Sequence, residues 1–184
     1  DYIVNKVMEI RCDVAVVGGG MSGICAAVAA ARHGAKTLLI QDRPVLGGNA
    51  SSEIRMHICG ADKHGAIDDA RESGIIEELL LENRYMNPQH SFSVQDAVFW
   101  NAVKRQNNLD LYLNTRMLDV ETANNRIVSV SAVQTTSEKR FRFYADYFID
   151  ATGDGYLGFA ANAEYMYGRE DKSASVSYTH LTLP

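Results

Sequence analysis

The feature that most constrains this chain of 184 residues is a glycine turn between an apolar run and a segment of small residues. The apolar run Cys12–Val17 predicts a buried strand, and Ile24–His33 predicts a helix. The turn between them has the spacing Gly-x-Gly-x-x-Gly. Gly18 forms the tight turn, Gly20 lets the backbone approach a phosphate, and Gly23 lets the helix pack closely on the strand. Because helix N-termini favour negative charge, the turn predicts a site for a dinucleotide diphosphate.

A second apolar run, Ala35–Ile40, follows the helix and predicts the parallel strand that completes a βαβ unit. Gly34, just before it, is typical of the residue that ends a helix. An acidic residue normally ends such a strand and binds the ribose hydroxyls. Gln41 stands in that place here, and Asp42 follows. We therefore expect the ribose contact from the Gln41 amide, or from Asp42 if the strand ends one residue later.

A second glycine pair, Gly47–Gly48, comes directly after this strand, within residues 42–52. A domain that binds NAD has no need of a second glycine pair there. A flavin dinucleotide lies extended across the sheet, so a second backbone segment must approach its ribityl and ring end. Arg43 would neutralise phosphate, while Asn49 and Ser51 offer hydrogen bonds. An ordinary glycine loop over the sheet is the alternative interpretation.

Four separated blocks carry a resemblance to a known family: Gly18–Gly23, Arg43–Asn49, Glu53–His57 and Asp150–Gly155. In this order, they resemble the FAD-dependent oxidoreductases of the glutathione-reductase-like superfamily. More narrowly, the chain is similar to a bacterial family of FAD-dependent oxidoreductases whose substrates are poorly assigned. The resemblance covers residues 12–170. It implies FAD as the cofactor and a redox reaction at the flavin ring.

The run Tyr144–Asp150 predicts a further strand of the parallel sheet, with its glycine-containing end at the same carboxyl edge as Gly18. In the superfamily that the chain resembles, this Ala-Thr-Gly step packs its backbone near the dinucleotide. The resemblance thus implies that Thr152 and Gly153 lie close to FAD. Asp154, followed by a glycine, is also a plain turn signal, and both interpretations stay open.

The remaining segments predict two amphipathic helices and three short alternating strands. The helices are expected at residues 73–84 and 95–106, and the strands at residues 109–122, 126–136 and 140–143. The sequence therefore predicts an α/β fold, a Rossmann-like parallel sheet with an inserted β-meander, as a truncated FAD/NAD(P)-binding domain. In the superfamily, such a meander precedes the Ala-Thr-Gly strand, which implies that the backbone of Met117 pairs with the adenine edge.

Taken together, these arguments give a predicted set of cofactor-binding residues. The set is Gly18, Gly20, Met21, Ser22, Gly23, Gln41, Asp42, Arg43, Gly47, Gly48, Asn49, Ser51, Met117, Thr152, Gly153 and Asp154.

Candidates for catalysis lie in the third block. Glu53, Arg55 and His57 alternate, so in an extended segment all three would point to one face, beside the flavin. Arg55 would bind an anionic substrate or stabilise the reduced flavin anion. His57 would act as a general acid or base, because its ordinary pKa lies near neutrality. The alternative is an ion pair and a hydrogen-bonded histidine that only support the loop.

The three cysteines show neither a Cys-x-x-Cys pair nor metal-ligand spacing, so we expect neither a disulfide redox centre nor a metal site. Cys12 and Cys25 are expected to be packing residues. Cys59, close to His57, is the one candidate for a reactive thiol. So few thiols fit a reducing compartment, and the predicted localisation is cytoplasmic.

Composition limits the possible partners. The net charge is −5 and no basic run interleaves with aromatic residues, which excludes electrostatically driven nucleic-acid binding. The apolar stretch at residues 24–31 is too short to span a bilayer. Residues 1–172 are expected to form an incomplete FAD-binding domain without its C-terminal return and substrate domain. Residues 173–184 are expected to be a non-native tail, because from Val176 they resemble a translated sequencing adapter.

The predicted function is an FAD-dependent oxidoreductase that transfers a hydride between a small organic substrate and the flavin, which an unidentified electron acceptor then reoxidises. The given portion alone is expected to be inactive. Two alternatives remain: a flavin-binding electron-transfer subunit without its own substrate, and a plain NAD-binding domain.

Overall fold

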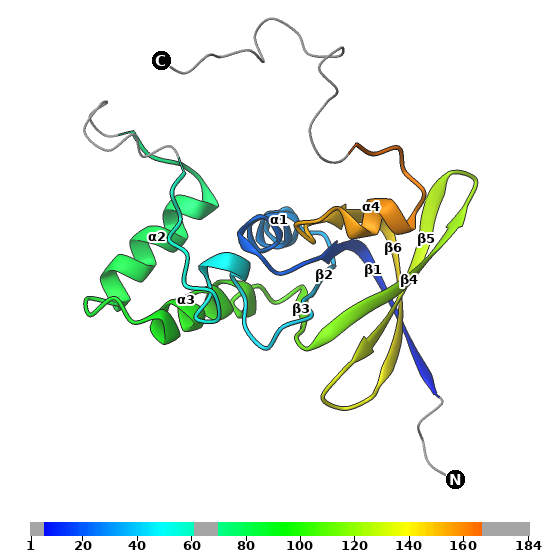
Figure 1. Cartoon of the computed structure of the whole chain (residues 1–184), viewed down its shortest axis with the longest axis horizontal. Helices are drawn as coiled ribbons and strands as arrows, with labels where there is room; N and C mark the ends of the chain where they lie inside the picture. The colour runs from blue at the N-terminus through cyan, green and yellow to red at the C-terminus, as the bar shows by residue number, and fades with distance from the viewer. Residues whose placement is uncertain (1–5, 61–69, 167–184) are drawn as a thin grey trace, which may run out of the picture.

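The computed structural model describes residues 6–60 and 70–166, and these build one six-stranded sheet flanked by helices (Figure 1). The strand order across the sheet is β3-β2-β1-β6-β5-β4. The strands are β1 (Val7–Val17), β2 (Thr37–Ile40), β3 (Leu109–Tyr112), β4 (Thr115–Ala123), β5 (Arg126–Gln134) and β6 (Arg140–Asp150). The first four strands across the sheet are parallel, whereas β5 and β4 are antiparallel to their neighbours. The predicted parallel sheet with a β-meander is confirmed.

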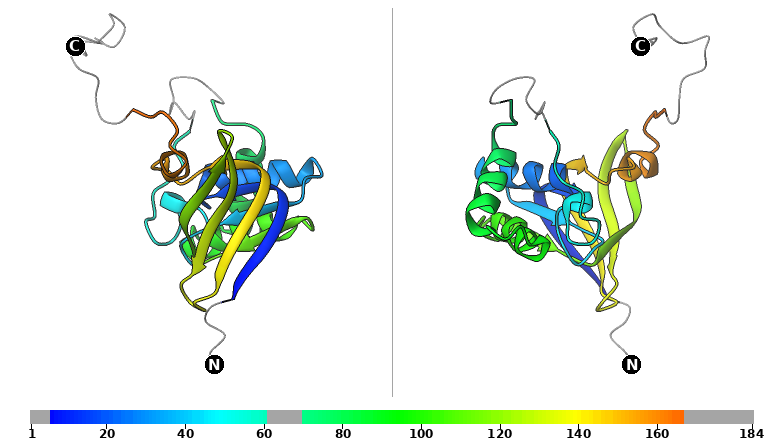
Figure 2. Two further views of the ribbon diagram at one scale, coloured as in Figure 1. Left: turned by 90° about the vertical axis from the view of Figure 1, so that its right-hand side faces the viewer. Right: turned by 60° about the vertical axis from the view of Figure 1, so that its left-hand side comes forward.

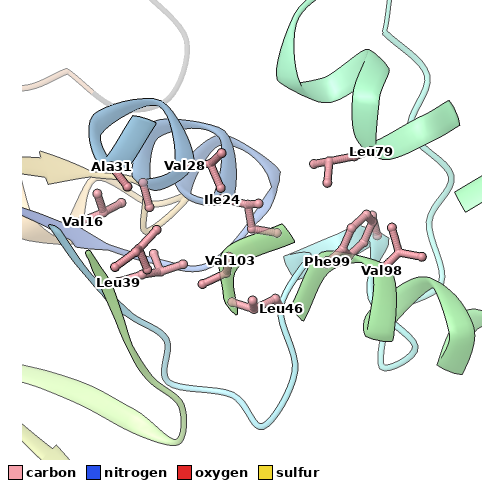
Figure 3. Packing of buried hydrophobic residues seen from close by; sticks show 13 residues of the cluster. Val16, Ile24, Val28, Ala31, Leu39, Leu46, Leu79, Val98, Phe99 and Val103 are labelled. Atoms are coloured by element: carbon pink, nitrogen blue, oxygen red, sulfur yellow. The ribbon is translucent and has the colours of Figure 1, made fainter. Parts of the chain in front are cut away.

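Three helices cover one face of the parallel strands: α1 (Met21–Arg32), α2 (Ile75–Met86) and α3 (Phe92–Lys104). Their shared core includes Ile24, Leu39 and Phe99, which are almost completely buried (Figure 3). Val16 of β1 and Leu39 of β2 belong to this core, whereas their neighbours Val17 and Leu38 belong to a second core on the other face of the sheet. Consecutive residues of these strands are therefore apolar, as expected for parallel strands covered on both faces. Helices α2 and α3 lie on the opposite side of the molecule from the meander strands β4 and β5 (Figure 2).

The second core lies between the sheet, the meander and the short helix α4 (Tyr156–Ala160). Phe141 and Phe143 of β6 stack with their ring centroids 5.4 Å apart, and Tyr112 of β3 meets both rings edge-on. This aromatic cluster packs beside Met117 of β4. The second core therefore fixes β4 relative to the end of the parallel sheet.

Helix α1 ends as the sequence predicts. Gly34 has φ +91°, its N–H donates to the Ala31 carbonyl at 2.9 Å, and the Ala35 N–H donates to the Ala30 carbonyl at 3.1 Å. These two bonds are those of a Schellman motif, which favours glycine at this position. The motif turns the chain directly into β2.

Two strand predictions are wrong. Residues 109–122 form two strands, because Asn114 takes a left-handed φ of +51° and the Thr115 N–H donates to the Gln41 carbonyl at 2.8 Å. The chain then leaves β3 at one edge of the sheet and enters β4 at the other. Conversely, residues 140–143 and 144–150 form the single strand β6, which pairs with β1 from Val7↔Arg140 to Val17↔Asp150. The expected domain limit at residue 172 and the expected tail 173–184 lie outside the described residues.

Candidate functional site

The first glycine turn joins β1 to α1, and two of its glycines are required by the fold itself. Gly18 has φ +104°, and a Cβ built on it would lie 2.1 Å from the carbonyl oxygen of Ala151. A Cβ on Gly23 would lie 1.8 Å from the Gly18 carbonyl oxygen. Any side chain at either position would collide with backbone that cannot move without displacing β1 or β6. These glycines therefore allow the close packing of strand, turn and helix that the sequence predicts.

Gly20 is different, because nothing within the described protein requires a glycine there. Its φ is −69°, which any residue adopts, and a Cβ built on it meets no atom within 4 Å. Gly20 is also the N-cap of α1, which has no side-chain cap and no acidic residue in its first turn. The first N–H groups of a helix have no partner within that helix. The turn thus presents a bare, electropositive helix end over open space, which fits a diphosphate.

The second glycine turn lies directly against the first. The Gly47 N–H donates to the Gly19 carbonyl at 2.8 Å, and Gly20 and Gly47 form an isolated parallel bridge. Gly47 has φ +109°, and a Cβ there would lie 2.8 Å from the Phe99 ring. A Cβ on Gly48 would lie 3.1 Å from the Gly20 Cα. Two segments that are far apart in sequence therefore meet at the carboxyl edge of the sheet.

A cavity of about 910 Å³ opens at this edge, between the two turns, the start of β4 and the loop after β6. This volume is within the range of small-molecule and cofactor sites. The predicted residues that line it are Gly18, Gly20, Met21, Ser22, Gln41, Asp42, Arg43, Gly47, Gly48, Asn49, His57, Met117, Thr152, Gly153 and Asp154. Gly23, Ser51 and Arg55 do not line it.

Several lining residues are absent from the sequence-based set. They include Ile54, Met56, Ile58, Thr115, Arg116, Ala151 and Tyr156. Ala151 stands within the Asp150–Gly155 block, so its neighbours gave a usable signal. Ile54 and Met56 stand between the alternating Glu53, Arg55 and His57, and that pattern pointed to the polar residues rather than to these apolar ones. Only the turn between β3 and β4 brings Thr115 and Arg116 to this edge.

Arg43 and Glu53 form an ion pair at the rim of the cavity, with Arg43 Nε 2.9 Å from Glu53 Oε2. The hydrogen bond that Arg43 donates to Glu53 and the negative charge of Glu53 raise the pKa of Arg43, so the guanidinium stays charged. Arg43 is the phosphate partner that the sequence predicts, and here a carboxylate already holds it. An incoming phosphate would have to share this guanidinium with Glu53.

The loop after β6 is organised by Asp150. Its Oδ1 accepts hydrogen bonds from the N–H and the hydroxyl of Thr152 at 3.0 and 2.7 Å, and its Oδ2 accepts from the Gly158 N–H at 2.9 Å. Burial acts to raise the pKa of Asp150, but these hydrogen bonds outweigh burial and hold that pKa below its usual value. Asp150 thereby fixes Thr152 and Gly153 at the cavity.

The segment with Glu53, Arg55 and His57 is not extended, which corrects the expectation that all three share a face. The N–H groups of Ile54 and Arg55 both donate to the Ser51 carbonyl, at 3.3 and 2.8 Å, and Arg55 has φ +65°. This turn breaks the alternation. Arg55 Nε donates to the Ser52 carbonyl at 3.0 Å, whereas Glu53 and His57 line the cavity.

The cysteines separate into two kinds. Burial raises the pKa of Cys12 to about 11, and burial also raises the pKa of Cys25. Cys59 is exposed, and its Sγ lies 3.2 Å from His57 Nε2. Within residues 6–60 and 70–166, no group of three or more His, Cys, Asp or Glu side chains is placed to hold a metal ion. No helix among these residues has the length and apolar character needed to cross a membrane.

The first glycine turn joins a strand to a helix, and the second glycine turn lies against it at the carboxyl edge of a parallel sheet. This arrangement defines a dinucleotide-binding domain of the Rossmann type. A family model described as FAD dependent oxidoreductase matches residues 13–181. The chain belongs to this family of FAD-dependent oxidoreductases.

Two curated proteins are similar to this chain in sequence, and a solved structure is similar to it in fold. The chain is 29% identical to "Fumarate reductase (cytochrome)" of Shewanella frigidimarina, over 83% of this chain and 34% of that protein. It is 32% identical to "Sarcosine oxidase subunit alpha" of Corynebacterium sp. (strain U-96), over 54% of this chain and 10% of that protein. THI4 of Thermovibrio ammonificans has the same fold, with a TM-score of 0.57 and 21% identity over 84% of this chain and 64% of that chain. The chain spans about a third of the length of the fumarate reductase.

Proposed function

We propose that this chain binds FAD along the cavity at the carboxyl edge of its sheet, as the cofactor-binding part of an oxidoreductase. The observation that carries the proposal is the contact between the two glycine turns, with the Gly47 N–H on the Gly19 carbonyl at 2.8 Å and open space over Gly20. A diphosphate at the start of α1 would be reached by backbone from both turns. Family membership supports FAD as the dinucleotide.

The edge of β4 supports a place for the adenine. The Thr115 N–H points away from β5, because it donates to the Gln41 carbonyl. Backbone groups alternate in direction along a strand, so the N–H and carbonyl of Met117 also point away from β5. Because β4 is the last strand of the sheet within residues 6–60 and 70–166, no further strand of this part of the chain pairs with these groups. We infer that they pair with the polar edge of the adenine.

The reaction that we propose is hydride transfer between a small organic substrate and the flavin, with an unidentified electron acceptor completing the cycle. FAD supplies the hydride chemistry when bound. His57 lines the cavity and would hold or move the accompanying proton, because imidazole is a common general acid and base in enzymes. Arg55 lies outside the cavity lining, and its bond to the Ser52 carbonyl supports its role in holding the loop rather than in contacting the substrate.

Flavin loading tests the cofactor proposal. The chain is expressed and purified, and its absorbance is recorded with FAD, FMN and NAD supplied in turn. We expect the absorbance bands of oxidised flavin to co-purify with the chain after incubation with FAD. Binding of NAD with no binding of FAD would contradict the proposal and favour the plain NAD-binding domain.

Anaerobic reduction tests the enzyme proposal, using the chain together with any continuation encoded downstream. The panel consists of sugars, polyols and hydroxy acids, with sarcosine added because of the name of one relative. We expect one substrate class to bleach the flavin, and His57→Asn to slow bleaching by roughly 100-fold while FAD content stays unchanged. Bleaching by a partner reductase but by no small molecule would favour the electron-transfer subunit.

A further inference from the structure

Gln41 uses its backbone and both ends of its side chain to join four segments of the chain around the cavity. Its N–H donates to the Tyr112 carbonyl at 2.9 Å, and its carbonyl accepts from the Thr115 N–H at 2.8 Å. Its Oε1 accepts from the Gly19 N–H at 2.8 Å, and its Nε2 donates to the Val45 carbonyl at 3.1 Å. The residue is only 5% exposed. Gln41 therefore ties the first glycine turn to the loop that leads into the second.

We propose that Gln41 is a positioning residue that holds the two glycine turns together, and that Asp42 takes over the contact with the ribose. The proposal deepens the proposed function and rests on it. The acceptor oxygen that would reach a ribose hydroxyl is already bonded to Gly19. Asp42 is exposed and lines the same cavity, so its carboxylate is available to accept hydrogen bonds.

The chemistry of the amide explains why glutamine stands where an acidic residue is usual. An amide both donates and accepts, whereas a carboxylate only accepts. A Gln41→Glu side chain would keep the bond from the Gly19 N–H but would turn a second oxygen toward the Val45 carbonyl oxygen. A protonated carboxyl group again has one donor and one acceptor. The proposal therefore predicts that Gln41→Glu is harmful when ionised and close to wild type when protonated.

The deciding experiment measures the FAD dissociation constant by fluorescence quenching between pH 5 and pH 8, for wild type and three variants. At the upper end of this range, we expect Gln41→Glu to bind FAD roughly tenfold more weakly, because FAD must then order the loop around Val45. The defect should shrink as the pH falls, since burial raises the pKa of a carboxyl group. Gln41→Met should bind FAD more weakly than wild type at every pH.

The matched control is Gln106→Glu, because Gln106 Nε2 also donates to a backbone carbonyl, that of Ala102 on α3, but does not line the cavity. The FAD affinity of Gln106→Glu should equal that of wild type at every pH. Charged groups that line the cavity are present in all four proteins. The FAD dissociation constant of each variant is therefore divided by that of wild type at the same pH. These groups are Asp42, Arg43, Glu53, His57, Arg116 and Asp154.

A carboxylate at residue 41 that binds the ribose would change the FAD affinity with pH in the opposite direction. If residue 41 contacts the ribose, Gln41→Glu would gain affinity relative to wild type as the pH rises. That result, or a defect that does not change with pH, would overturn the proposal. Urea unfolding without FAD gives an independent readout, because the clamp forms without ligand. The free energy of unfolding of Gln41→Glu, relative to that of wild type, should also rise as the pH falls. A failure of wild type to bind FAD would count against the proposed function alone, because the unfolding measurement needs no FAD.

Ribose recognition is tested separately by comparing ADP with 2′,3′-dideoxy-ADP. Wild type should prefer ADP, Asp42→Ala should remove most of that preference, and Gln41→Met should keep it while weakening both ligands. A merely structural role of Asp42 would lower both affinities equally. Loss of the preference in Gln41→Met would show that Gln41 itself contacts the ribose, and would refute the assignment.

Discussion

Gly20→Ala should separate cofactor binding from folding. Its φ of −69° suits alanine, and the added Cβ has no atom of the described residues within 4 Å. Alanine is a poorer N-cap than glycine, but it also restricts the unfolded chain, and these two effects oppose each other. We expect the free energy of unfolding without ligand to change by less than about 1 kcal/mol.

The same Cβ stands where the backbone of the turn would meet the diphosphate. Displacing the ligand would lengthen one or two hydrogen bonds to a charged group, each of which contributes about 1.5–3 kcal/mol. We therefore expect FAD to bind roughly 10- to 100-fold more weakly to Gly20→Ala. The assay is a fluorescence titration with FAD, combined with urea unfolding of the ligand-free protein.

Gly34→Ala is the complementary control. Gly34 has φ +91° and lies at the far end of α1, outside the cavity lining. Alanine there should lower the free energy of unfolding by about 1 kcal/mol, because the left-handed conformation is strained, and should leave the affinity for FAD unchanged. Equal FAD affinity in Gly20→Ala and wild type would refute the reasoning, as would affinity losses in both variants that simply follow stability.

Two further predictions concern the loop after β6 and the cysteines. Asp150→Ala should lower the free energy of unfolding by about 1 kcal/mol near neutral pH. The folded pKa of Asp150 lies below its usual value, so this contribution is complete above the unfolded-state pKa and is lost as the pH falls through the folded pKa. In urea titrations, the difference in stability between wild type and variant should therefore begin to shrink below about pH 4 and continue to shrink as the pH falls further. A difference that stays constant down to pH 2 would contradict this prediction. Iodoacetamide at pH 8 should label Cys59 before Cys12, because a Cys12 thiol with a pKa of about 11 is only about 0.1% ionised at that pH. Peptide mass mapping measures the rate at each cysteine. Labelling of Cys12 as fast as that of Cys59 would contradict the burial of Cys12.

The glycine spacing predicted the centre of the fold because each glycine has a local physical reason that can be read from the sequence. Gly18 and Gly23 need to be free of side chains, and Gly34 needs a left-handed φ, wherever the rest of the chain lies. The strand, helix and strand around them follow from apolar runs that suit a sheet covered on both faces. The position of the cavity edge therefore followed from short stretches of sequence.

The errors arose where pairing across the sheet overrides local pattern. The break between β3 and β4 depends on the bond from the Thr115 N–H to the Gln41 carbonyl, between residues 74 positions apart. β6 is continuous because β1 extends back to Val7 and pairs with its whole length. Neither partner is visible in a window of ten residues. The alternation of residues 53–57 failed for a similar reason, since the Ser51 carbonyl captures two N–H groups and forms a turn.

Gln41 shows the same limit at the site. Gln41 lines the cavity at the end of β2, but its bonds to Gly19 and Val45 depend on how the two turns approach each other. A residue type alone does not say whether an amide faces ligand or backbone. Only the three-dimensional arrangement distinguishes a ribose contact from a clamp.

The most direct test of the central claim is a crystal structure of this chain with FAD bound. The diphosphate should lie at the start of α1, within hydrogen-bonding distance of the backbone at Gly20–Ser22 and beside Gly48, with the adenine against the free edge of Met117. A dinucleotide bound at another edge of the sheet, or a diphosphate in contact with only one of the two glycine turns, would contradict the claim.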